Sequence, residues 1–97
     1  AYTQLVEDRP LEAAGHRALA QVRRRQKKHE AEARQWSIAA TLKPEDPMFR
    51  VEEALALSHL GKTDEAVKKL RALLAAKWDD AYSSALGEAR ALLRRLE

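Results

Sequence analysis

The chain has no cysteine among its 97 residues, which excludes disulfides, thiolate metal sites and thiol redox chemistry. It has only three glycines and three prolines, and aromatic residues make up 5% of it. Strand-forming residues are sparse, and no run alternates between apolar and polar residues. Because helix breakers and strand formers are both scarce, the abundant Ala, Leu, Glu, Arg and Lys predict an all-helical protein.

No apolar run approaches the roughly 20 residues that a membrane-spanning helix needs, and no signal peptide is recognisable. The composition is 45% hydrophobic and 34% charged, which is typical of one soluble globular domain, with the cytoplasm as the default compartment. The formal net charge of +3 is mild and does not by itself indicate nucleic-acid binding. The first residue is Ala1 and not methionine, which is compatible with a processed protein or with a domain of a longer one, and we expect the domain.

Motifs that carry chemistry are also missing. The chain has three histidines, His16, His29 and His59. Their spacing is not that of a metal site, so we expect no metal and no cofactor. The neighbouring carboxylates Glu52-Glu53 and Asp79-Asp80 would point about 100° apart on a helix, which suits solvated faces and caps better than acid/base catalysis. With no glycine-rich phosphate loop either, the protein is not expected to be an enzyme.

The clearest pattern lies in residues 47–80, which read as two helices joined by a tight turn. Pro47 suits the first turn of a helix, and Asp46 before it can accept a hydrogen bond from a helical N–H. Gly61 can adopt the left-handed backbone that ends a helix, and Thr63 is a suitable N-cap for the next one. Apolar residues recur at three- and four-residue spacing on both helices: Val51, Ala54, Leu55, Leu57 and Leu60, then Ala66, Val67, Leu70, Leu73 and Leu74. Two helices alone cannot bury both stripes, so this unit must stack on neighbours.

This span resembles a tetratricopeptide repeat (TPR), a 34-residue helix–turn–helix unit. Ala54 stands at the small-residue position of the first helix and Leu57 at the tyrosine position. Ala66 and Leu70 match the A-x3-F block of the second helix. Three residues depart from the family pattern: Arg50, Glu53 and Trp78.

Residues 13–46 align with residues 47–80 as a degenerate first repeat. Leu19 and Pro44 match the family pattern, whereas Glu32 occupies the alanine position and Lys27 stands where the turn glycine belongs.

The 34-residue register favours a turn near residues 26–29. Residues 16–43 contain no Gly or Pro, so one unbroken helix over 11–42 is the alternative. We expect residues 1–9 to be a lead-in or the end of an upstream helix, and residues 81–97 to form a capping helix with an amphipathic stripe. The expected fold is therefore an all-α, α-solenoid-like stack of about five helices.

The resemblance implies a ligand in the concave groove that the first helix of each repeat lines. The corresponding groove residues are Arg17, Gln21, Arg24, Val51, Leu55 and Ser58, and Arg25 is expected to add charge selectivity toward the partner. Arg17 and Gln21 are chemically similar to a Lys-x3-Asn pair with which some family members hold a carboxylate. The expected function is a non-catalytic scaffold or adaptor that binds a peptide or partner domain with acidic and apolar residues. In the alternative interpretation, Arg17 and Gln21 are simply exposed helix positions.

Two other functions remain open. The chain could be an oligomerisation or spacer segment that self-associates through Leu92, Leu93 and Leu96 on its last helix. It could also bind nucleic acid or another anionic surface through the basic run at residues 23–28. Nucleic acid is the less favoured partner of that run, because no aromatic residues interleave it.

Overall fold

Five α-helices follow one another through residues 13–97, the part of the chain that the computed structural model describes. The predicted lead-in at residues 1–9 lies outside the described residues. The helices are α2 (Ala13–Arg25), α3 (His29–Leu42), α4 (Met48–His59), α5 (Thr63–Ala75) and α6 (Ser83–Leu96), with a short 3-10 turn, η1 (Asp80–Tyr82), before the last.

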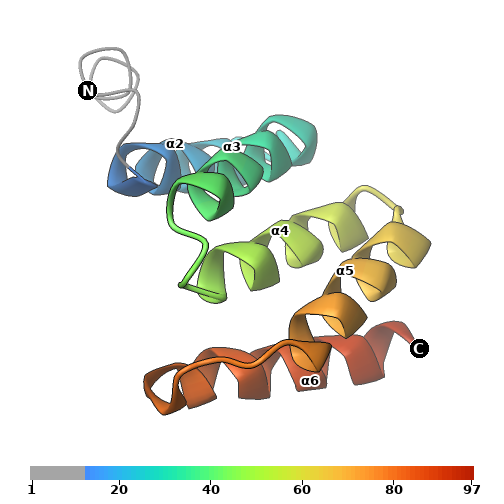
Figure 1. The fold of residues 1–97 in the computed structure, drawn as a ribbon. Helices are drawn as coiled ribbons and strands as arrows, with labels where there is room; N and C mark the ends of the chain where they lie inside the picture. The colour runs from blue at the N-terminus through green and yellow to red at the C-terminus, as the bar shows by residue number, and fades with distance from the viewer. Residues whose placement is uncertain (1–12) are drawn as a thin grey trace.

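Each helix packs against the next along the chain, and α4 also packs against α6 (Figure 1). Figure 1 shows α2 and α3 side by side at the top, α4 below them, and α6 at the bottom. The prediction of an all-α stack of helices is confirmed for residues 13–97.

The turn expected near residues 26–29 is present, because α2 ends at Arg25 and α3 begins at His29. Lys27 has a φ of 58°, in the left-handed region that residues other than glycine rarely adopt. Two backbone hydrogen bonds close the turn, from Lys28 N–H to the Arg23 carbonyl at 2.9 Å and from Lys27 N–H to the Arg24 carbonyl at 3.0 Å. These bonds satisfy carbonyls at the end of α2, so the chain reverses without a glycine.

The turn between α4 and α5 repeats this geometry 34 residues later. Gly61, with a φ of 79°, replaces Lys27. Lys62 donates to the Leu57 carbonyl at 3.0 Å, and Gly61 donates to the Ser58 carbonyl at 3.1 Å. The two hairpins therefore share their turn and their register, which is the geometry of a helical repeat. The turn between α2 and α3 excludes a single helical rod over the described part of 11–42.

Two predicted helix starts have different outcomes. The Oδ1 of Asp46 accepts a hydrogen bond from the Met48 N–H at 3.0 Å, as expected for the start of α4. The prediction of Thr63 as an N-cap is wrong, because Thr63 is already the first residue of α5 and Lys62 precedes it without a side-chain capping bond. The N–H of Lys62 closes the turn at Gly61 by donating to the Leu57 carbonyl, and α5 starts at the next residue.

Small residues hold the helices close together in the core. Ala20, Ala54, Ala66 and Ala89 are completely buried, and their lack of bulk lets neighbouring backbones approach. Larger side chains fill the remaining space, among them Trp36, Phe49, Leu57, Leu70 and Leu73.

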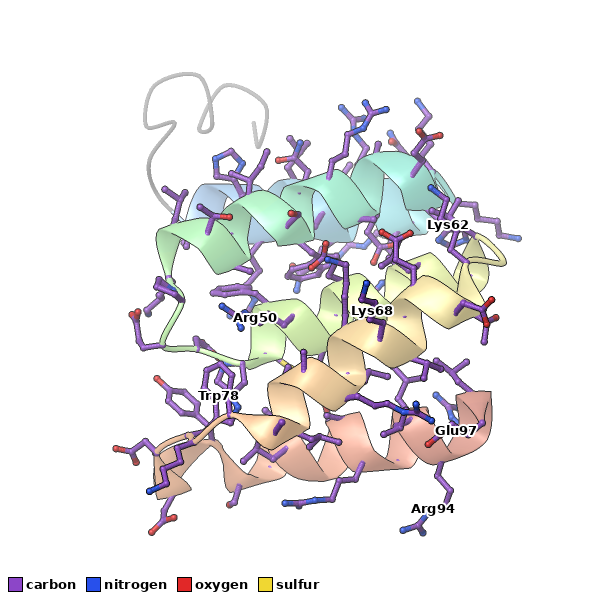
Figure 2. All side chains as sticks on the ribbon, turned by 45° about the vertical axis from the view of Figure 1, so that its right-hand side comes forward. Arg50, Lys62, Lys68, Trp78, Arg94 and Glu97 are labelled. Atoms are coloured by element: carbon purple, nitrogen blue, oxygen red, sulfur yellow. The ribbon has the colours of Figure 1, made fainter. Side chains whose placement is uncertain are left out.

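The last helix has one buried and one polar face. Ala85, Ala89 and Leu92 are buried against the core, whereas Arg90 and Arg94 are exposed. Figure 2 shows Arg94 pointing away from the stack. A polar outer face is what the terminal helix of a helical stack needs in order to meet water.

Candidate partner-binding groove

A hollow of about 320 Å³ lies between α4 and α6. Its residues are Val51, Glu52 and Leu55 from α4, and Glu88, Ala91, Leu92 and Arg95 from α6. Val51 and Leu92 are buried and Leu55 is half-buried. The hollow therefore combines an apolar lining with two carboxylates and one guanidinium.

Sequence reasoning placed two of these residues, Val51 and Leu55, in a binding groove, and the structure brings them together in this hollow. It did not place Glu52 there, and it missed the α6 residues Glu88, Ala91, Leu92 and Arg95. The 34-residue register fails at the last helix, so the repeat pattern could not assign them. The amphipathic pattern of residues 81–97 predicted a helix but gave no indication of which of its polar residues would face α4.

The other expected partner-binding residues lie outside the hollow. Arg17, Gln21 and Arg25 are exposed on α2, as a docking surface requires. The hydroxyl of Ser58 donates to the Leu55 carbonyl of its own helix at 2.6 Å, so it is already used within the chain. Whether any of these residues contacts a partner stays a prediction.

Arg24 is held inside the chain by two carboxylates. Its Nε donates to Glu32 at 2.7 Å, and its Nη2 donates to Glu52. The Cζ of Arg24 lies 5.7 Å from the centre of the Trp36 ring. Desolvation lowers the pKa of the guanidinium, but the bonds and charges of Glu52 and Glu32 outweigh it, so the pKa lies above its ordinary value. Arg24 thus links α2, α3 and α4.

This arrangement explains why Glu32 occurs where a small apolar residue was expected. The Glu32 side chain is completely buried, and it accepts hydrogen bonds from Arg24 and from Trp36 Nε1, the latter at 2.9 Å. A buried carboxylate needs such partners to avoid a large desolvation cost. In the part of the chain that the structure describes, every buried side-chain nitrogen and oxygen atom has a hydrogen-bond partner.

A second depression, of about 510 Å³, lies between α3 and α5. It is lined by Ser37, Ala40, Thr41, Pro44, Arg50, Glu53, Lys69, Ala72 and Leu73. The side chain of Glu53 is only 13% exposed, and its nearest cation, Lys69 Nζ, is 3.7 Å away. Burial raises the pKa of the Glu53 carboxyl group, and the charge of Lys69 only partly opposes the rise.

At one end of this depression, the Cζ of Arg50 lies 5.5 Å from the centre of the Trp78 ring, and both residues are labelled in Figure 2. Trp78 Nε1 also donates to the Leu73 carbonyl at 2.6 Å. Trp78, which departs from the TPR pattern, is half-buried, and its hydrogen bond holds the segment after α5 against the end of that helix.

The structure also shows where the residues lie on which the two alternative functions, anionic-surface binding and self-association, depend. Arg25, Lys27 and Lys28 of the basic run are exposed at the α2–α3 turn, whereas Arg24 turns inward. Leu92 is buried, and Leu93 and Leu96 pack partly buried against the core. The three leucines therefore serve the fold of this chain.

No three His, Cys, Asp or Glu side chains within residues 13–97 are grouped so that they could hold a metal ion. None of the helices in this range is long and apolar enough to cross a bilayer.

Comparison of the chain with protein-family models, with curated proteins and with solved structures gives no significant match.

Proposed function

We propose that this chain is a TPR-like, non-catalytic interaction module that binds a peptide or a partner domain across α2, α4 and α6. The observation that carries the proposal is the hollow between α4 and α6, where Val51, Leu55 and Leu92 meet. The repeated turn geometry, 34 residues apart, supports the TPR-like interpretation of the two hairpins.

The chemistry of this face indicates the kind of partner. An apolar side chain of a partner would contact Val51 and Leu55, and burying it would supply most of the affinity, about 1.5–3 kcal/mol per aliphatic anchor. Arg17 and Arg25 on α2 are exposed cations, so they would favour acidic residues on the partner segment that crosses α2. We therefore propose a partner segment with an apolar anchor and flanking acidic residues.

A peptide selection tests this function. A library of displayed peptides is screened against the 97-residue chain, and the recovered peptides are titrated against the wild type and against Leu55→Glu. The variant places a carboxylate in the hollow, so we expect at least a tenfold loss of affinity. Ile38→Glu is the matched control, because Ile38 is an exposed apolar residue of α3 outside the hollow.

Equal affinity of the wild type and Leu55→Glu for every selected peptide would rule out the hollow as the docking site. Circular dichroism of the two variants shows whether both keep their helices, so that a loss of binding is not mistaken for unfolding.

A further inference from the structure

Two histidines that are far apart in sequence meet at one end of the stack. His29 is the first residue of α3, and His59 is the last residue of α4. The centroids of their rings are 4.9 Å apart, and the ring planes are inclined by 57°. Both hairpin turns lie at this end, and Figure 2 labels Lys62 at the α4–α5 turn. Each hairpin therefore contributes one imidazole.

The separation of the rings suits two imidazoles on one metal ion. A Zn–N bond of about 2.0–2.1 Å places a ring centroid about 3.2 Å from the ion. Two such rings at a tetrahedral angle of about 109° have centroids about 5.2 Å apart. The 4.9 Å between the ring centroids of His29 and His59 is close to this value.

The surroundings of His29 favour one nitrogen as the ligand. Its Nδ1 lies 3.3 Å from Glu32 Oε1. A carboxylate at one ring nitrogen fixes the tautomer and leaves the other nitrogen, here Nε2, available to a metal. Glu32 is itself held by Arg24 and Trp36, so the support for His29 is rigid.

We propose that His29 and His59 form a two-histidine site for a late divalent transition metal of the Zn²⁺, Ni²⁺ or Cu²⁺ class. Imidazole is a ligand that these ions prefer. No third protein ligand within residues 13–97 completes the set, so water or a group from a bound partner takes the other positions. Two protein ligands hold an ion more weakly than three or four do. Lys28, next to His29 in the chain, and Lys62, shortly after His59, are exposed cations whose charge opposes that of the ion.

An ion at this position has a structural consequence. It would join the start of α3 to the end of α4 and so fasten the first hairpin to the second. Because imidazole binds a metal only when it is neutral, the affinity should fall as the solution is acidified. The inference does not depend on the groove between α4 and α6.

Calorimetric titration of the full chain with Zn²⁺, and with Mg²⁺ as the oxygen-preferring control, tests the site. We expect one Zn²⁺ per chain and no binding of Mg²⁺. His29→Asn and His59→Asn should each weaken Zn²⁺ binding at least tenfold, whereas Lys62→Ala, a change beside the pair that removes no ligand, should not weaken it. His59 is exposed, so its replacement should leave the fold intact, which circular dichroism checks.

Electron paramagnetic resonance of the Cu²⁺-loaded chain gives a second measurement. Two coupled imidazole nitrogens are expected in the wild type, and one in each single variant. The proposal is overturned if Zn²⁺ does not bind, or if both variants bind it as tightly as the wild type does. The latter result would place the ion elsewhere on the chain.

Discussion

The Nε of Arg24 lies 2.7 Å from the carboxylate of Glu32, whose side chain is completely buried between the helices. The same guanidinium reaches Glu52 on α4. One side chain of α2 therefore compensates a buried charge on α3 and connects it to α4. The contact fastens the first hairpin to the second.

Arg24→Ala should destabilise the fold by about 2–3 kcal/mol. Removing one partner of a fully buried ion pair costs about 3–5 kcal/mol, and the loss is smaller here because 36% of the Arg24 side chain is exposed. Urea unfolding followed by circular dichroism measures the change in the free energy of unfolding.

The double variant Arg24→Ala/Glu32→Ala should lose less stability than the sum of the two single variants, because it leaves no unpaired carboxylate in the core. Additive losses in this double-mutant cycle would show that the two side chains act independently.

This network also marks the limit of what the sequence could predict. Helical periodicity and the 34-residue register identified the helices, the turn after α2 and the buried positions at Leu70 and Leu73, because these depend on local pattern. Arg24 was assigned to a partner because the TPR resemblance implies a groove at its helix position. The compensating carboxylates come from two other helices, and no local pattern pairs them with Arg24.

The histidine pair and the α6 side of the hollow were missed for a related reason. His29 and His59 belong to different hairpins, so only the stacking of the hairpins brings them together. Glu88 and Arg95 follow a register that departs from the repeat, and their neighbours on α4 depend on how the last helix packs.

Lys27→Gly should stabilise the protein, since Lys27 has the left-handed backbone that Gly61 adopts at the equivalent turn. Replacing a left-handed non-glycine residue by glycine removes about 1–2 kcal/mol of backbone strain. The greater backbone entropy of glycine in the unfolded chain offsets about 0.5–1 kcal/mol of this gain. The net gain therefore lies between about 0 and 1.5 kcal/mol, and 1 kcal/mol corresponds to a Tm increase of about 4–8 °C for a domain of this size.

Lys28→Gly is the matched control for this prediction. Lys28 has a φ of −93°, which lysine adopts without strain, so glycine there should lower Tm. If Lys27→Gly lowers Tm as Lys28→Gly does, the left-handed residue is not a source of strain in the turn.

Glu53→Gln should raise the stability at neutral pH. Burial raises the pKa of Glu53 above its ordinary value of 4.5, so the folded chain binds more protons than the unfolded chain just above that pH. The contribution of Glu53 to stability therefore declines as the pH rises from about 4.5 through the raised pKa. Glutamine removes this dependence, and Tm at pH 7 should increase by a few degrees.

At pH 4, where Glu53 is largely protonated in both states, wild type and Glu53→Gln should have similar Tm values. Glu52→Gln provides the contrast on the same helix, because it removes the ion pair with Arg24 and should lower Tm at neutral pH. A lower Tm for Glu53→Gln at pH 7 would mean that the attraction of Lys69 outweighs the cost of burying the carboxylate.

Amide chemical-shift mapping tests the central claim most directly. An isotope-labelled chain is titrated with the tightest peptide from the selection, and shifted resonances are assigned to residues. The account predicts that the largest shifts cluster at Gln21, Leu55 and Ala91, on α2, α4 and α6. A cluster at Ser37, Thr41 and Ala72, in the depression between α3 and α5, would contradict it.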